Sequence, residues 1–235
     1  KYDNESRSAD DSFLEEDELQ RHIEACADIN FIPPKFTKIL DIINQIKKND
    51  GADGKVIIWS VFISNILRLH NFLSDNGVTS EVLYGAIESE DPDDKSISDD
   101  TTSITRENII RRFHSDIDLK VIIANPLVVG ESISLHKACH NAIYLDKDYN
   151  AASYMQSKDR IHRVDNNTNY VVNYFHLISE RSIDELIHDK ICAREAKQLE
   201  MLETNEIPLL IKPNEDLITS DILKEYYDRR IKSNH

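Results

Sequence analysis

Residues 120–164 read KVIIANPLVVGESISLHKACHNAIYLDKDYNAASYMQSKDRIHRV. Two short apolar runs, KVIIA at 120–124 and AIYL at 142–145, each lead into a polar loop, and a predicted helix over 151–163 follows the second loop. Continuous apolar runs are typical of strands whose two faces are both covered by helices. The stretch therefore predicts a strand, loop, strand, loop and helix within an α/β protein.

The same alternation extends in both directions. We expect strands at 56–61, 80–84, 120–124, 142–145 and 170–177, and helices at 13–30, 35–48, 63–75, 105–115, 151–163, 182–202 and 222–231, with a weak helix near 132–138. Thr105 is a suitable N-cap for the helix that follows it. Helices between successive apolar strands indicate an α/β fold with a doubly wound parallel sheet.

The predicted helix over 151–163 carries an amide and two guanidinium groups. Gln156, Arg160 and Arg163 are four and then three residues apart, so they share one helical face. Such an array of donors suits a phosphate or a carboxylate. The alternative is that the two arginines are solvated surface charges paired with Asp159 and Asp165.

In parallel sheets, ligands bind at the carboxyl ends of the strands. The loops 125–135 and 146–150 should therefore lie on the same rim as the start of the arginine helix. They bring Gly130, Ser132, Ser134, Asp146 and Tyr149 to that rim. The chain has no GxxxxGK[ST] loop and no DExx carboxylate pair, so the rim is half of a phosphoryl-transfer site.

These segments, in this order, resemble motifs V and VI of the C-terminal RecA-like lobe of superfamily-two helicase-related ATPases, and among these the SWI/SNF-type DNA translocases. QSKDRIHR matches the family pattern Q-x-x-x-R-x-H-R, and DKDYN is similar to its D-x-x-W-N segment. KVIIWSVF resembles the first strand of that lobe, and TRENIIRRF its R-x-x-x-I-x-x-F helix. The similarity extends over roughly residues 36–201 and implies a RecA-like helicase C-terminal lobe.

The resemblance assigns roles to individual residues. Arg160 and Arg163 would be arginine fingers directed at a γ-phosphate, with Gln156 positioning them. The nucleotide side would also include Gly130, Ser132, Ser134 and Asp159. Contacts to nucleic acid would come from Arg106, Arg111, Asn125 and Tyr149.

The sequence departs from the family pattern in two places. Motif V has lost two glycines and its usual Thr and Asn, and it carries Pro126, Val129, Ser132 and Ser134 instead. Serine enters positive φ less readily than glycine, so the loop conformation or its coupling to hydrolysis is expected to differ. The segment after Arg163 is VDNN where the family usually has I-G-Q.

Composition limits the other possibilities. The formal net charge of −15 argues against a generally basic surface that coats nucleic acid, although 106–112 and the Arg160 region are locally basic. The three cysteines are widely spaced, which predicts reduced thiols and no metal site. No apolar run is long enough to span a bilayer. A chain that begins at Lys1 is expected to be a fragment, or a processed or trimmed form, of something longer.

We expect three parts: 1–34 as a linker and helix, 35–181 as the lobe, and 182–235 as a helical brace. The resemblance implies a motor lobe of an ATP-dependent translocase on double-stranded DNA. Its ATP and Mg²⁺ would be held mainly by its own N-terminal lobe, outside this chain, and the chain alone would be inactive.

The alternative is a noncatalytic interaction module, in which the acidic segment 88–100 binds a basic protein. A small-molecule enzyme is disfavoured, because no nucleophile and base can be placed together on the rim. The expected location is the cytoplasm or nucleoid in a prokaryote and the nucleus in a eukaryote.

Overall fold

The computed structural model describes residues 31–50, 54–88, 105–128, 134–162 and 171–204. The helices predicted at 13–30 and 222–231 lie outside these residues. The chain divides into two units, Lys1–Lys38 and Ile39–His235, and the sheet belongs to the second. Within the described ranges, none of the helices combines the length and the apolar character that crossing a membrane requires.

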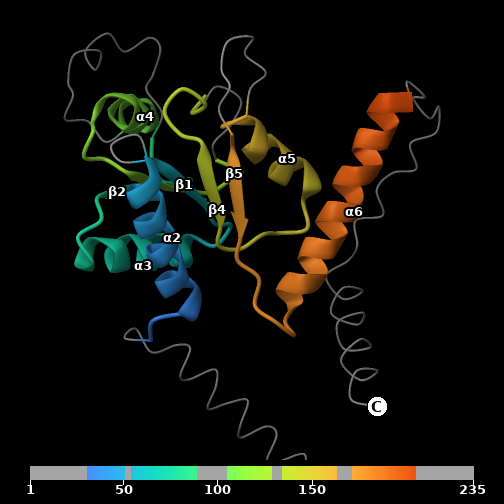
Figure 1. Cartoon of the computed structure of the whole chain (residues 1–235), viewed down its shortest axis with the longest axis horizontal. Helices are drawn as coiled ribbons and strands as arrows, with labels where there is room; N and C mark the ends of the chain where they lie inside the picture. Colours follow the sequence, from blue (N-terminus) through green and yellow to red (C-terminus); the bar gives the residue numbers. More distant parts are fainter. Residues whose placement is uncertain (1–30, 51–53, 89–104, 129–133, 163–170, 205–235) are drawn as a thin grey trace, which may run out of the picture. The chain divides into compact units, whose positions relative to one another are not determined.

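Five parallel strands form one sheet in the order β2-β3-β1-β4-β5. They are β1 (Val56–Trp59), β2 (Ser80–Leu83), β3 (Val121–Ala124), β4 (Asn141–Tyr144) and β5 (Asn173–His176). The first strand, β1, lies in the middle of the sheet. The chain then forms β2 and β3 on one side of β1, and afterwards β4 and β5 on the other side (Figure 1). The structure confirms the doubly wound parallel α/β fold predicted from the sequence.

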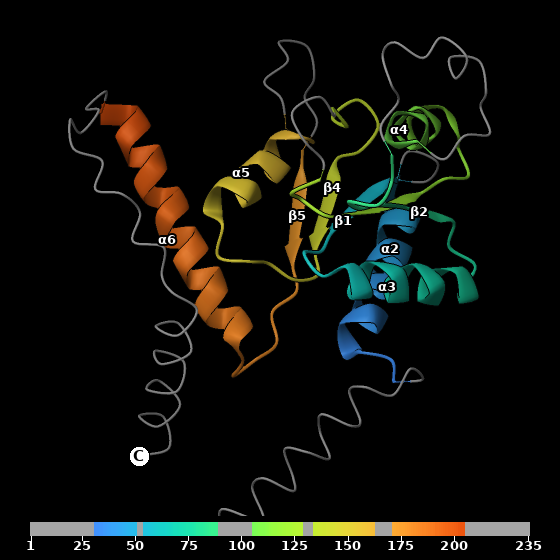
Figure 2. The same ribbon diagram turned by 180° about the vertical axis from the view of Figure 1, so that it is seen from behind.

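The helices are α2 (Pro34–Asp50), α3 (Ile63–Asp75), α4 (Arg106–Ser115), α5 (Ala151–Asp159) and α6 (Ile183–Thr204). From Ile39 onward, α2 lies with α3 on one side of the sheet, and α4 and α5 lie on the other (Figures 1 and 2). Helix α6 lies beside α5, next to the β5 edge (Figure 2).

Alternate residues of the central strands pack in two separate layers. Ile57 pairs in register with Ile122 and Ala142, and all three join a cluster that includes residues of α4, α5 and α6. The intervening Ile58 is fully buried on the opposite face, where α3 contacts β2 and β3. Because both faces are covered, the strands need apolar residues at every position, and this explains the continuous runs in the sequence.

Three predicted elements differ from the structure. The weak helix expected near 132–138 is wrong for its described part, where a single turn closes with the Ala138 and Cys139 N–H groups donating to Leu135 O. The strand expected over 170–177 is shorter in its described part, where β5 begins at Asn173, which pairs with Asn141, the first residue of β4.

The arginine helix is also shorter than expected, since α5 ends at Asp159 and Arg160 is its C-cap residue. In a longer helix the Arg160 carbonyl would accept from residue 164. Here it accepts from the Leu135 N–H at 2.9 Å. The Arg160 carbonyl is thus bonded to the loop that precedes β4.

Candidate functional site

The carboxylate of Asp146, directly after β4, joins the rims of two neighbouring strands. It accepts hydrogen bonds from Ser60 Oγ at 2.7 Å, from Val61 N at 2.6 Å and from Asn65 Nδ2 at 3.0 Å. All three donors follow β1 in the chain. Asp146 therefore fixes the path by which the chain leaves β1 and enters α3, and it shapes the rim from which the predicted ligand loops extend.

Asn125 makes the corresponding connection after β3. Its Nδ2 donates to Val61 O at 3.1 Å, and its Oδ1 accepts from Leu127 N at 2.9 Å. The residue is only 7% exposed. Its expected contact with nucleic acid stays a prediction. In the structure its side-chain amide bonds to the backbone of Val61 and Leu127.

The end of the predicted motif V lies against the arginine turn. Ser134 Oγ lies 2.5 Å from His136 Nδ1, and its carbonyl accepts from His114 Nε2 of α4 at 3.1 Å. The next residue, Leu135, donates its N–H to Arg160 O. The structure therefore brings Ser134 and Arg160 together, although 26 positions separate them in the sequence.

The residues of motif VI differ in burial. Gln156 and Asp159 are exposed on α5, whereas Arg160 is half-buried at its C-cap. Arg163, Gly130 and Ser132 lie outside the described residues. The roles assigned to these six residues remain predictions.

The two α4 arginines are placed differently. The Nε of Arg106 donates to Ile87 O at 2.7 Å, its Nη2 donates to Gly85 O at 3.3 Å, and its backbone N–H donates to Glu88 O. Arg106 thus fastens the connection between β2 and α4. Arg111 is exposed and lies five residues further on, about 140° away around the helix. The structure does not bring these two residues to one face.

The DKDYN segment builds the start of α5. Asn150 is the N-cap and accepts from Ser153 N at 3.1 Å, while Asp148 accepts from Asn150 N at 3.1 Å. Burial raises the pKa of the Asp148 carboxyl and of the Tyr149 phenol. The Tyr149 hydroxyl is buried and has no hydrogen-bond partner among the described residues. The Tyr149 hydroxyl is therefore covered by the protein, whereas the hydroxyl of a residue that only contacts DNA would be exposed.

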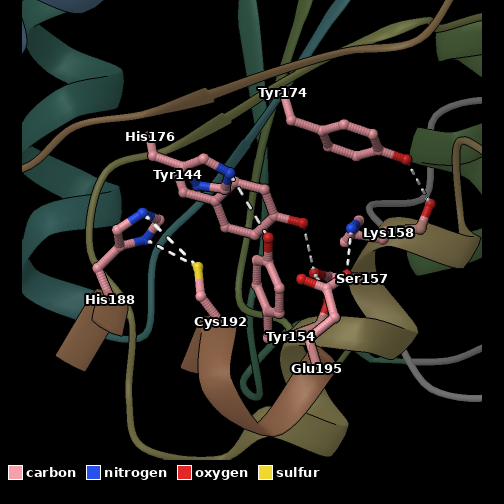
Figure 3. Close-up of polar contacts among 9 residues, drawn as sticks. All are labelled: Tyr144, Tyr154, Ser157, Lys158, Tyr174, His176, His188, Cys192 and Glu195. Atoms are coloured by element: carbon pink, nitrogen blue, oxygen red, sulfur yellow. Dashed lines mark hydrogen bonds and ion pairs between the residues drawn. The ribbon is translucent and has the colours of Figure 1, made fainter. Parts of the chain in front are cut away.

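A cluster of aromatic and ionisable side chains lies where β4, β5, α5 and α6 meet (Figure 3). Tyr144 stacks on His176 with ring centroids 4.9 Å apart, and its hydroxyl lies 2.8 Å from Ser157 Oγ. Burial, followed by the nearby charges of Lys147, His188 and Lys158, lowers the pKa of His176 to about 3. Burial also raises the pKa of the Tyr174 phenol to about 12.

The sequence reasoning missed this cluster. Its members come from four elements, and no local spacing relates Lys147 to His188, whose Nζ and Nδ1 atoms are 2.7 Å apart. Within the cluster, the sequence could have related only His188 and Cys192, whose spacing of four residues places them one turn apart on α6. Among the described residues, no group of three or more His, Cys, Asp or Glu side chains is arranged to hold a metal ion.

Comparison with known proteins gives concordant results. Residues 34–165 match the family described as "Helicase conserved C-terminal domain". The chain is 28% identical over 166 residues to "Helicase SWR1" of Candida glabrata and 26% identical over 172 residues to "Helicase SWR1" of Saccharomyces cerevisiae. These alignments cover 71% and 73% of the chain but only 10% of each relative.

One solved structure supports the fold. The C-terminal part of the Fun30 ATPase domain superposes with a TM-score of 0.59 at 24% identity, covering 83% of this chain and 54% of that one. The agreement extends to the parallel sheet flanked by helices, which is the architecture of a RecA-like C-terminal lobe.

Proposed function

Because the chain belongs to the helicase conserved C-terminal domain family, as a SWI/SNF-type member of superfamily two, we propose that it is the C-terminal motor lobe of an ATP-dependent translocase on double-stranded DNA. In this role Arg160 and Arg163 act as arginine fingers. Gln156 positions them, and the nucleotide is held mainly by an N-terminal lobe outside this chain.

The observation that carries the proposal is the hydrogen bond from Leu135 N to Arg160 O. It ties the end of motif V to the turn that bears the arginines, and both lie toward the amino ends of the strands, because α5 runs back from the carboxyl end of β4. Arg160 is half-buried there. A half-buried guanidinium stabilises negative charge on a phosphate more strongly than one exposed to bulk water.

The residues present fit one side of a nucleotide rather than all of it. Arg160 supplies donors for phosphate oxygens, and among the described residues no three or more His, Cys, Asp or Glu side chains are grouped so as to hold a metal ion. In this proposal the metal and most of the triphosphate are bound by the other lobe. When ATP is bound between the lobes, this chain's contribution is to orient donors and to neutralise developing charge.

Arg111 and the rim tyrosine Tyr149 are the DNA contacts we propose. Arg111 is exposed on α4, as a phosphate contact requires. The half-buried Tyr149 follows β4, just before the start of α5. Because the two named relatives are yeast proteins, the nucleus is the location we propose.

The test is ATP hydrolysis with and without duplex DNA, measured for this chain alone and for the longest natural form of the protein. We expect no hydrolysis by the chain alone and strong stimulation by duplex DNA in the longer form. Absence of hydrolysis with every nucleic acid would contradict the motor proposal. It would favour the interaction module, and binding of a basic protein to segment 88–100 would then be measured.

A further inference from the structure

Helix α5, which leads into Arg160, is held mainly from outside itself. It has only nine residues, and isolated helices of this length are marginal in water. Its N-terminus is capped by Asn150, but its last turn gives way to Arg160 and then to a turn in which the Ile161 and His162 N–H groups donate to Lys158 O. The position of Arg160 therefore depends on what α5 packs against.

Helix α6 supplies an apolar support for α5. Ile187 and Ile191 are buried in the same cluster as Tyr154 of α5 and Ile161 just beyond it. On the same side of α6, the His188 ring lies 5.2 Å from His176, which in turn lies 5.9 Å from the Tyr154 ring (Figure 3). This layer fixes the distance between the two helices but does not prevent one from sliding along the other.

Polar bonds at both ends of α5 prevent that sliding. Arg194 Nη1 donates to the carbonyl of Tyr149, two residues before α5, at 2.8 Å. Glu195, the next residue of α6, forms an ion pair with Lys158 in the last turn of α5 (Figure 3). The exposed fractions of the Lys158 and Glu195 side chains are 28% and 19%, so solvent screens this pair less than a surface pair.

A third element reinforces the Lys158 end. The Lys158 ammonium lies 5.6 Å from the Tyr154 ring centroid and 5.2 Å from that of Tyr174, and Tyr174 Oη donates to Lys158 O at 3.4 Å. Lys158 is therefore held on its backbone and on its side chain, two residues before Arg160.

We propose that α6 is a clamp on α5, with Arg194 and Glu195 as positioning residues that set where Arg160 points. The inference rests on the proposed function for its catalytic consequence. The contacts of Arg194 and Glu195 are with residues at the two ends of α5. Arg194 and Glu195 act on Arg160 through Tyr149 and Lys158. A movement of α6 would therefore be transmitted to the turn that carries Arg160.

The first test is hydrogen exchange over residues 151–160 in the longest natural form of the protein, comparing wild type with Glu195→Gln. Loss of an ion pair of this kind changes a local opening equilibrium by about fivefold, so these amides should exchange about fivefold faster. Glu185→Gln is the matched control, since Glu185 is exposed on the same helix. Unchanged exchange over 151–160 in Glu195→Gln would overturn the clamp.

The second test is the steady-state kinetics of DNA-stimulated ATP hydrolysis. Glu195→Gln should lower kcat several-fold with little change in KM for ATP, and the exchanged pair Lys158→Glu with Glu195→Lys should recover much of the loss. Faster exchange with wild-type kcat would overturn the positioning role. If wild type itself shows no stimulated hydrolysis, the proposed function fails, while the exchange measurement still decides whether α6 clamps α5.

Discussion

At the scale of single residues, polar side chains that suggest chemistry also build the rim. Asp146 and Asn125 follow strands β4 and β3, where a ligand site is expected, yet both direct their oxygens and nitrogens at neighbouring backbone and side chains. A sequence shows that such residues lie at strand ends. It does not show whether their hydrogen bonds go inward or to a ligand.

Asp146→Asn is expected to destabilise the protein by about 1–3 kcal/mol. In the variant, an NH2 group replaces one of the two carboxylate oxygens that accept from Ser60, Val61 and Asn65. An acceptor is thus lost and two groups of donors face each other. The free energy of unfolding in urea measures the effect. Asp118→Asn, at an exposed carboxylate after α4, serves as the control and should change it by less than about 0.5 kcal/mol. Equal stability of the two variants would contradict the account.

His176 predicts a pH dependence of stability. Its pKa is lowered to about 3 in the folded protein, from an ordinary value of 6.5, so the unfolded chain binds more protons between these values. Stability from this group is therefore present above pH 6.5 and is lost as the pH falls toward 3. His176→Gln should lose less stability between pH 7 and pH 5 than wild type does. Parallel curves of urea midpoint against pH would show that His176 does not contribute.

At the scale of elements, capping and packing follow from the sequence more reliably than element ends do. Thr105 was predicted to cap α4, and its side chain accepts from Asn108 N at 3.2 Å. The end of α5 at Asp159 was not predicted, and Arg160, just after it, bonds to Leu135, a distant contact that local propensity does not include. For the same reason no local pattern relates α6 to α5.

Helix α4 provides a prediction that separates DNA binding from structure. Arg111→Gln, at an exposed position, should change stability by less than about 0.5 kcal/mol. It should reduce the slope of log affinity for duplex DNA against log salt by about one, because one phosphate contact is lost. Arg106→Gln should instead destabilise the protein by about 1–2 kcal/mol, since the side-chain bonds to Ile87 O and Gly85 O are lost. Affinity at several salt concentrations and urea unfolding, both measured on the longest natural form, check the pair.

Two outcomes would contradict this division of roles. One is an Arg111 variant with an unchanged salt slope, which would remove Arg111 from the DNA surface. The other is an Arg106 variant of wild-type stability with a reduced salt slope, which would mean that Arg106 contacts phosphate in spite of its bonds to the 85–88 segment.

At the scale of the whole molecule, the sequence was sufficient to predict the sheet and the family. The apolar runs at 56–61, 120–124 and 142–145 have no polar alternation, and that pattern requires helices on both faces. The sequence predicted the segments that carry the site residues but not their placement, since α5 runs back from the carboxyl end of β4 and carries Arg160 toward the amino ends of the strands. Which donors bind inward depends on contacts between residues far apart in the chain, such as Asn125 with Val61 and Leu135 with Arg160.

The central claim is that this lobe supplies arginines to a nucleotide held by another part of the protein. The direct measurement is kcat for DNA-stimulated ATP hydrolysis, together with ATP affinity, in the longest natural form carrying Arg160→Ala or Arg163→Ala. Arg68→Ala on α3, across the sheet from α5, is the matched control. We predict that either finger substitution lowers kcat by about 100-fold or more while ATP affinity stays within a few-fold of wild type, and that the control does neither. Hydrolysis that is indifferent to both arginines would contradict the claim.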